Sequence, residues 1–216
     1  MDEDQAGRLG VLLAWAGFGF GLVALVLQFS LTVPQAMVNG RSLAGAIEYY
    51  FSFFTILSNA ALVLVHLASA SGAPSLARLR RPVVRAGMTG VMLFVCAFYH
   101  FVLASTWAPQ GWFAVADVAL HYAAPLFYAG WWLRFAPHGG VTMRRIPVIA
   151  AWPFAYALYA LARGEVVRAY PYPVLDAAVL GYGRVAANIA GLLIVFAALC
   201  AGVILIDRLL ARDRPA

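Results

Sequence analysis

Five polar residues recur at helical spacing inside an otherwise apolar stretch, and their side chains could do chemistry. They stand at offsets of 0, 4, 7, 11 and 18 along the chain: Glu48, Ser52, Thr55, Asn59 and His66. In one continuous helix these offsets return to the same face, so the residues would form a polar stripe. A single hydroxyl in such a helix usually bonds to its own backbone or to a neighbouring helix. A stripe of five predicts a polar partner surface or a water-filled cavity.

A carboxylate and an imidazole four residues apart provide a candidate partner for this stripe. Asp117 and His121 would share a helix face, where the carboxylate can orient the ring. Pro125 has no N–H, so it leaves the His121 carbonyl free for another donor. Thr55 and His121 lie twelve and nine residues from the starts of their apolar runs. That difference places their depths within ~5 Å of each other. Contact is therefore allowed, although a purely structural, hydrogen-bonded His121 stays open.

Other polar residues lie near the same depth or at the same end of the apolar runs. Tyr99 and His100 adjoin that depth, and His100 with His121 could bind a metal or a haem, although two histidines make no ligand-spacing motif. The fifth helix adds four residues on one face, Trp152, Tyr156, Tyr159 and Arg163, and the sixth adds Arg184 and Asn188, which are expected to face inward. Aromatic residues at this spacing are more often packing, and arginines at a helix end more often contact lipid headgroups.

The composition shows which kind of protein must position these residues. The chain has 216 residues, of which 64% are apolar and 11% are charged. A soluble domain carries about 25% charged residues, so a disordered chain, a nucleic-acid module and an ordinary cytosolic enzyme are excluded. All 15 basic residues are arginine, which is typical of a GC-rich, bacterial genome. Cys96 and Cys200 lie in apolar runs and predict neither a disulfide nor a CxxC metal site.

Six apolar runs approach the ~20 residues that a membrane-spanning helix needs. They cover about residues 9–32, 43–68, 83–106, 112–135, 146–162 and 185–209. The runs are long and lack period-two alternation, so strands are excluded. The sequence therefore predicts an all-α fold, in which residues 1–216 form a single transmembrane domain built as a bundle of six helices.

The arginines predict the orientation of this bundle. The N-terminus, the second and fourth loops and the C-terminus carry eleven of them: Arg8, Arg78, Arg80, Arg81, Arg85, Arg134, Arg144, Arg145, Arg208, Arg212 and Arg214. The other loops carry four: Arg41, Arg163, Arg168 and Arg184. Basic residues concentrate on the cytoplasmic side, so both termini are expected there. The expected location is the plasma membrane of a bacterium, with membrane lipids as neighbours and no nucleic-acid partner.

Several motifs, taken together, resemble a known family. They are YFSFFTILSN at residues 50–59, YH at 99–100, DVALHYAAP at 117–125, WPFAY at 152–156, RG at 163–164 and YPYPVLD at 170–176. From about Glu48 to Asn188 the chain is similar to the bacterial six-helix relatives of the androgen-induced and androgen-dependent transmembrane hydrolases. The resemblance implies a membrane-embedded hydrolase of esters between fatty acids and hydroxy fatty acids. It further implies a threonine nucleophile at Thr55 and a histidine at His121, with no metal and no cofactor.

This implied chemistry suggests roles for the neighbouring residues. His121 would take the proton of the Thr55 hydroxyl and later activate water. The spacing, rather than the family, suggests that Asp117 holds the imidazole tautomer, unless it is a structural partner of Arg184. Candidate donors to the developing oxyanion are Asn59, Ser52 and Tyr99. Arg163, Arg168 and Arg184 could hold a fatty-acid carboxylate. Water would reach Thr55 along the stripe that begins at Glu48.

Two other kinds of function stay open on the sequence alone. A membrane carrier or lipid-binding protein without enzymatic activity could use the polar stripe to line a binding cavity. The sequence has no detectable inverted repeat of the kind common in transporters, which counts modestly against transport. A haem or metal protein would use His100 and His121.

Overall fold

The computed structural model describes residues 3–106 and 108–212, so Arg214 lies outside the described residues. The described chain is helical and contains no strand. Its α-helices are α1 (Glu3–Val38), α2 (Leu43–Phe51), α3 (Phe54–Ser71), α4 (Pro82–Phe98), α5 (Trp112–Val118), α6 (Ala124–Phe135), α7 (Ile146–Val167) and α8 (Ala177–Arg212). Short 3-10 helices are η1 (Pro74–Arg80), η4 (Met143–Arg145) and η5 (Pro173–Leu175), and π-helical turns are η2 (Tyr99–Leu103) and η3 (Ala119–Ala123).

Five of the described helices are long and apolar enough to cross a membrane. They are α1, α3, α4 with η2, α7 with η4, and α8. The expected spans 9–32, 146–162 and 185–209 lie entirely within these helices. The expected span 83–106 does so except for its last three residues. Of the expected span 43–68, only the part from Phe54 onward lies in a spanning helix. Pro153 lies within α7, which nevertheless continues to Val167. Their length and composition indicate an integral membrane protein.

The expected helix over residues 43–68 is interrupted, so the continuous polar stripe is wrong. Ser52 ends α2, and Phe53 has extended backbone angles (φ −87°, ψ 133°) before α3 begins at Phe54. The Ser52 hydroxyl donates to the Tyr49 carbonyl at 2.7 Å, which is a local alternative to continued helix. The Tyr156 hydroxyl donates to the Ser52 carbonyl at 2.9 Å, so α7 satisfies a backbone group at the break. Glu48 and Thr55 consequently belong to different helices.

The expected helix over residues 112–135 is helical throughout, but its hydrogen-bonding pattern changes in the middle. The α-helices α5 and α6 are joined by η3, where the Ala124 N–H bonds to the Ala119 carbonyl five residues before it. Neither α-helical part alone is long enough to cross a bilayer.

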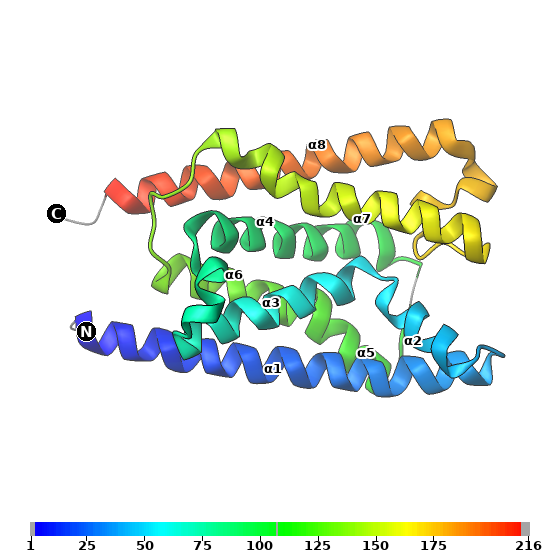
Figure 1. Ribbon diagram of the computed structural model, residues 1–216, viewed down its shortest axis with the longest axis horizontal. Coiled ribbons are helices and arrows are strands. Elements are labelled where there is room, and N and C mark those ends of the chain that lie inside the picture. Colours follow the sequence, from blue (N-terminus) through cyan, green and yellow to red (C-terminus); the bar gives the residue numbers. More distant parts are fainter. Residues whose placement is uncertain (1–2, 107, 213–216) are drawn as a thin grey trace.

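Figure 1 shows how the helices are arranged. α1 runs along one side of the bundle and packs against α2, α3 and α6. α4 lies between α6 and α8, and α7 packs on α8. α1 begins at the same end of the bundle as α8 ends (Figure 1).

His66 belongs to the packing of this bundle rather than to a polar stripe. Its side chain is 1% exposed, and its ring lies 5.2 Å from that of Tyr128 and 5.8 Å from that of Trp131. On α1, a Cβ atom at Gly17 would lie 2.5 Å from the imidazole, so only glycine allows this close approach. The fifth member of the expected stripe therefore serves the contact of α1, α3 and α6.

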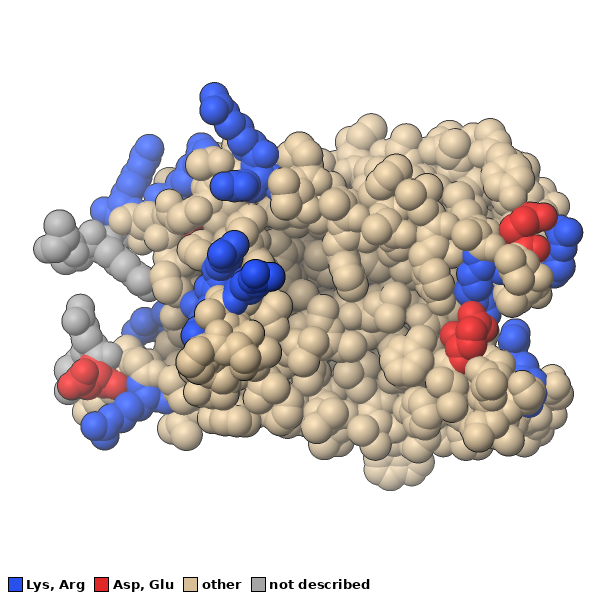
Figure 2. Space-filling model, viewed as in Figure 1, with Lys and Arg blue, Asp and Glu red and all other residues tan. Residues whose placement is uncertain are grey.

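The surface divides into three zones along the bundle. On the face that Figure 2 shows, arginines gather at the end where α1 begins and α8 ends, with an acidic side chain beside them, and the middle zone carries no charge. The opposite end carries acidic and basic side chains together (Figure 2). Large apolar side chains are exposed in the middle, including Val23, Leu126 and Ile194, as expected for a surface that faces lipid.

Candidate active site

The first turn of α3 and the π turn η3 bring the side chains of Thr55 and His121 together. The Thr55 hydroxyl oxygen lies 3.2 Å from Nε2 of His121. Thr55 is 8% exposed and the His121 side chain is 15% exposed, so both are largely shielded. The contact that the matching depths allowed is present in the structure.

Asp117 determines which nitrogen of His121 carries the hydrogen. Nδ1 of His121 lies 3.0 Å from the Asp117 backbone carbonyl and 3.2 Å from the Asp117 carboxylate oxygen Oδ1. Both of these oxygens are acceptors, so Nδ1 is the protonated nitrogen of the neutral ring. The lone pair of Nε2 then faces the Thr55 hydroxyl, which can donate its proton to it. This is the orientation that a general base requires.

Tyr99 supports this arrangement from η2. Its hydroxyl donates to Oδ2 of Asp117 in a short hydrogen bond. Its ring stacks on the His121 imidazole with 4.0 Å between centroids and 18° between planes. The Tyr99 hydroxyl is therefore engaged with the carboxylate rather than free to bind an oxyanion. Arg184 is exposed, and the partners of the Asp117 carboxylate are His121 and Tyr99, so the expected pairing of Asp117 with Arg184 is not present.

Tyr99 and His121 both lie in π turns, η2 and η3, which the sequence analysis missed. A π turn places one extra residue in a helix, and such turns are frequent at functional sites. In η3 the Ala124 N–H donates to the Ala119 carbonyl, so it does not donate to the Leu120 carbonyl as it would in a regular α-helix. The next possible donor is Pro125, which has no N–H. The amide of Asn59 fills this place by donating to the Leu120 carbonyl at 3.2 Å.

The remaining oxyanion donors expected from the sequence are engaged elsewhere. Asn59 donates to the Thr55 carbonyl at 2.9 Å as well as to Leu120, so it links α3 to η3. Ser52 donates to its own helix. Asn59 and Ser52 are both fully buried and line neither of the cavities described below. Their assignment as oxyanion donors is not supported, and Asn59 is instead a positioning residue.

Arg163 also has a different partner from the one expected. Its guanidinium forms a two-point ion pair with Glu48, in which Nη2 lies 2.9 Å from Oε2, and Nη1 donates to the Ala169 carbonyl at 2.7 Å. Hydrogen bonding from Arg163 lowers the pKa of Glu48. Arg163 is 8% exposed and is fully occupied by these partners. Arg163 therefore links α2 to the chain that follows α7. Its guanidinium has no donor directed toward a substrate carboxylate.

The other expected binding residues lie away from Thr55. Arg168 is exposed and pairs with Glu165 at 3.0 Å. His100 is exposed, and its Nδ1 lies 3.0 Å from the Tyr122 hydroxyl. The described residues contain no group of three histidine, cysteine or acidic side chains that could hold a metal ion. The arrangement does not favour a joint ligand role for His100 and His121, because both nitrogens of His121 face other groups.

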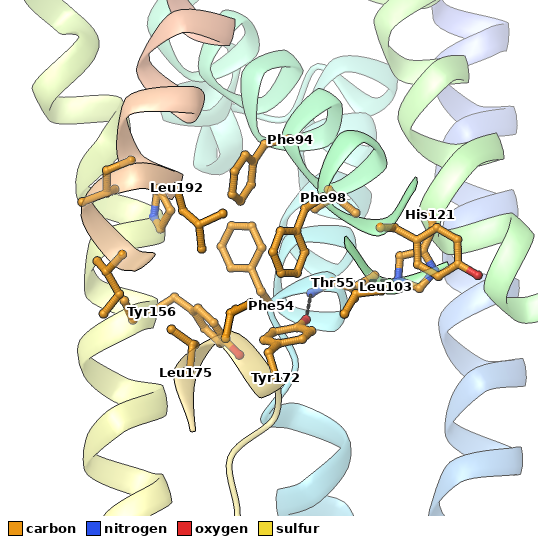
Figure 3. Close-up of a pocket in the computed structure, with 17 residues that line it drawn as sticks. Phe54, Thr55, Phe94, Phe98, Leu103, His121, Tyr156, Tyr172, Leu175 and Leu192 are labelled. Atoms are coloured by element: carbon orange, nitrogen blue, oxygen red, sulfur yellow. Dashed lines mark hydrogen bonds between the residues drawn. The ribbon is translucent and has the colours of Figure 1, made fainter. Parts of the chain in front are cut away.

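Two cavities meet at Thr55 and His121. Five residues line both of them: Thr55, Tyr99, Leu103, His121 and Tyr172. The first cavity lies between α4, α7 and α8, and its walls are almost entirely apolar; its empty space is about 630 Å³, which includes space open to the outside. Figure 3 shows Phe94, Phe98, Leu175 and Leu192 around this apolar cavity, with Thr55 and Tyr172 at its edge.

The second cavity is more polar, and its empty space is about 1920 Å³, which includes space open to the outside. Four polar residues at offsets of 0, 4, 7 and 11 line it: Gln28, Thr32 and Gln35 of α1, and Asn39 directly after α1. Asp117 lines the same cavity, whereas Glu48 does not. The polar lining of the cavity that reaches Thr55 therefore comes from the end of α1 and from Asn39 rather than from the expected stripe. These residues have the same helical spacing in the sequence as the expected stripe, but they are three carboxamides and one hydroxyl and include no ionisable group.

Tyr172 is a further site residue that the sequence analysis did not single out. It lies on the connection between α7 and α8 and is 7% exposed. The Thr55 backbone N–H donates to its hydroxyl oxygen over 3.5 Å, as the dashed line in Figure 3 shows. The YPYPVLD segment that contains it was noted only as part of a resemblance.

Comparison of the chain with protein-family models, curated proteins and solved structures finds no match. The geometry of the site therefore carries the functional assignment.

Proposed function

We propose that this protein is a membrane-embedded hydrolase of lipid esters with Thr55 as nucleophile and His121 as general base. The observation that carries this proposal is the 3.2 Å contact between the Thr55 hydroxyl and the unprotonated nitrogen of an imidazole held by Asp117. A threonine hydroxyl is a weak nucleophile until a neighbouring base takes its proton. A nucleophile, a base and a group that orients the base are the three parts that acyl transfer requires.

The first half of the reaction forms an acyl-enzyme. The Thr55 oxygen attacks the ester carbonyl carbon while His121 Nε2 takes the hydroxyl proton. Asp117 stabilises the imidazolium that results. When the tetrahedral intermediate collapses, the bond between the carbonyl carbon and the alcohol oxygen breaks. His121 returns its proton to the departing alkoxide, which leaves as the alcohol.

The second half releases the acid. Water enters through the polar cavity, and His121 removes one of its protons as the oxygen attacks the acyl carbon. The bond between Thr55 and the acyl group then breaks. The proton returns to the Thr55 oxygen, and the carboxylic acid leaves. No further co-reactant is needed.

The two cavities suggest how a lipid ester is placed. The apolar cavity suits the acyl chain, because burial of each CH₂ group contributes about 0.8 kcal/mol. The polar cavity, lined by α1, suits the alcohol part and the incoming water. In esters of fatty acids with hydroxy fatty acids, the substrates implied by the family resemblance, the acyl chain would occupy the apolar cavity and the hydroxy fatty acid the polar one.

The same proposal includes six membrane crossings. Residues Trp112–Phe135 are continuously helical through α5, η3 and α6, and they supply the sixth crossing. The end of the bundle rich in arginine faces the cytoplasm, as the distribution of basic residues favours. Both termini then lie in the cytoplasm, and the membrane is the plasma membrane of a bacterium.

A fluorophosphonate probe tests the proposal directly, because it labels an activated hydroxyl covalently. Purified protein should be labelled, and Thr55→Ala should abolish labelling and ester cleavage together. Thr89→Ala is the matched control, since Thr89 is also buried, in α4, but its hydroxyl donates to the Arg85 carbonyl instead of contacting a histidine. Labelling that survives Thr55→Ala would sink the proposal. Absence of labelling with intact lipid binding would favour a carrier or lipid-binding protein.

A further inference from the structure

The start of α3 presents a backbone donor to the point where the two cavities meet. The first N–H groups of a helix have no carbonyl partner within it. At Thr55 this N–H points to the Tyr172 hydroxyl oxygen over 3.5 Å, which is a long hydrogen bond. The N–H of a nucleophilic residue is a known component of an oxyanion hole. The break between α2 and α3 thus has a chemical consequence.

We propose that Tyr172 is a further catalytic residue, whose hydroxyl and the Thr55 N–H together form the oxyanion hole. This inference rests on the proposed function. As Thr55 attacks, the carbonyl oxygen of the ester gains negative charge. It accepts hydrogen bonds from the Tyr172 O–H and the Thr55 N–H, and it displaces the long bond between them.

Tyr172 has a hydrogen to donate. Its oxygen accepts from the Thr55 N–H, which leaves its own hydrogen for another acceptor. Burial raises the pKa of the phenol, although hydrogen bonds from Thr55 and Phe54 oppose this effect. The group is therefore protonated at neutral pH. The three donors expected from the sequence have other acceptors, whereas Tyr172 faces both cavities.

The loop that carries Tyr172 is held in place on both sides. Before it, Arg163 donates to the Ala169 carbonyl at 2.7 Å. After it, Asn188 donates to the Val174 carbonyl at 2.8 Å. A Cβ atom at Gly164 would lie 2.1 Å from the Tyr170 ring, so glycine is needed for this loop to seat on α7. A donor fixed before the reaction stabilises developing charge without reorganisation.

The ring of Tyr172 is held independently of its hydroxyl. Phe53 and Phe98 meet it edge-on, with 5.9 Å and 5.6 Å between ring centroids. Tyr172→Phe therefore keeps these contacts and removes only the donor. Removing one oxyanion-hole donor typically lowers kcat by about 10²-fold to 10³-fold.

The experiment measures ester cleavage by wild type, Tyr172→Phe and Tyr170→Phe. Tyr170 lies on the same loop but lines neither cavity, so it is the matched control. We expect Tyr172→Phe to lower kcat about a hundredfold with little change in KM, and to slow fluorophosphonate labelling in parallel. Tyr170→Phe should stay near wild type. A Tyr172→Phe protein with wild-type kcat, or with a changed KM alone, would overturn the inference.

A second measurement needs no change at Tyr172 and covers a variant that fails to fold. A thionoester substrate carries sulfur in place of the carbonyl oxygen, and sulfur is a weak hydrogen-bond acceptor. Wild type should cleave it much more slowly than the matching ester; equal rates would contradict an oxyanion hole. If Thr55→Ala abolishes labelling but these outcomes fail, only the role of Tyr172 is wrong. If Thr55→Ala retains labelling, the proposed function itself is wrong.

Discussion

Among the described residues, two pairs of histidine and aspartate have the same spacing between their atoms. In the candidate active site, Nδ1 of His121 lies 3.2 Å from Oδ1 of Asp117. At the other end of the bundle, Nδ1 of His138 lies 3.2 Å from Oδ1 of Asp207, where the chain after α6 meets α8. The difference lies at the second nitrogen. Nε2 of His121 faces a hydroxyl, whereas Nε2 of His138 lies 3.2 Å from the Leu133 carbonyl.

This difference separates a reactive pair from a structural one. Both nitrogens of His138 face oxygen acceptors, so neither lies beside a hydroxyl whose proton it could take. Asp207 also accepts from the Gly139 N–H at 3.0 Å, and both side chains of the pair are 1% exposed. The His121–Asp117 pair instead borders two cavities. A histidine beside an aspartate is therefore not sufficient for catalysis, since the atom facing its other nitrogen and the access to it decide the role.

The largest expected effect comes from removing the nucleophile Thr55 or the base His121. Thr55→Ala and His121→Ala should each lower turnover at least about a thousandfold, because nucleophile and base act as a unit. The double variant should be scarcely slower than either single one. His138→Ala should keep its turnover per folded molecule. Steady-state ester cleavage measures all four, and defects that multiply in the double variant would show two independent contributions instead of one centre.

A matched substitution of the two carboxylates sharpens the comparison. Asp117→Asn should lower kcat about tenfold to a hundredfold, less than the ~10⁴-fold seen for a triad aspartate, because the Asp117 backbone carbonyl still fixes the tautomer. Asp207→Asn should leave kcat unchanged and lower the thermal midpoint of unfolding in detergent, since it weakens a buried pair. Turnover and thermal unfolding are measured on both variants. The opposite pattern would exchange the roles assigned to the two pairs.

The smallest effect concerns the group behind the reactive carboxylate. Tyr99→Phe keeps the ring stacked on His121 and removes the hydroxyl that donates to Asp117. One hydrogen bond to a charged group contributes about 1.5–3 kcal/mol, of which only part reaches the transition state, so we expect a loss of about tenfold or less in kcat. Tyr122→Phe is the control, because the Tyr122 hydroxyl contacts His100 instead. Equal kinetics for the two variants would remove Tyr99 from the site.

The spans were predictable from the sequence wherever local pattern decides structure. Long apolar runs indicated the helices now seen as α1, α4, α7 and α8. The break after Ser52 was not predictable, because neither glycine nor proline marks it. It is stabilised by Tyr156 and Tyr172, which lie 104 and 117 residues along the chain from the backbone groups that they meet.

The candidate site divides in the same way. Asp117 and His121 are four residues apart, and a helix brings such residues onto one face whatever surrounds them. Arg163 was expected at a substrate, and its actual partner Glu48 is 115 residues away. The depth argument for Thr55 and His121 allowed the right contact, although the helix along which it counted to Thr55 is broken at Ser52 and Phe53. The polar residues Gln28, Thr32, Gln35 and Asn39 were missed, although their spacing repeats that of the expected stripe.

The π turn η3 has a consequence for insertions and deletions. An α-helix advances by about 100° per residue, so one extra residue turns the two halves of a helix relative to each other by that angle. α5 can thus direct Asp117 toward the site while α6 directs Tyr128 and Trp132 into the core. Loss of a single codon between Ala119 and Ala123 would restore a regular helix and force one of these faces out of register. In this segment the number of residues is therefore constrained as strictly as their identity.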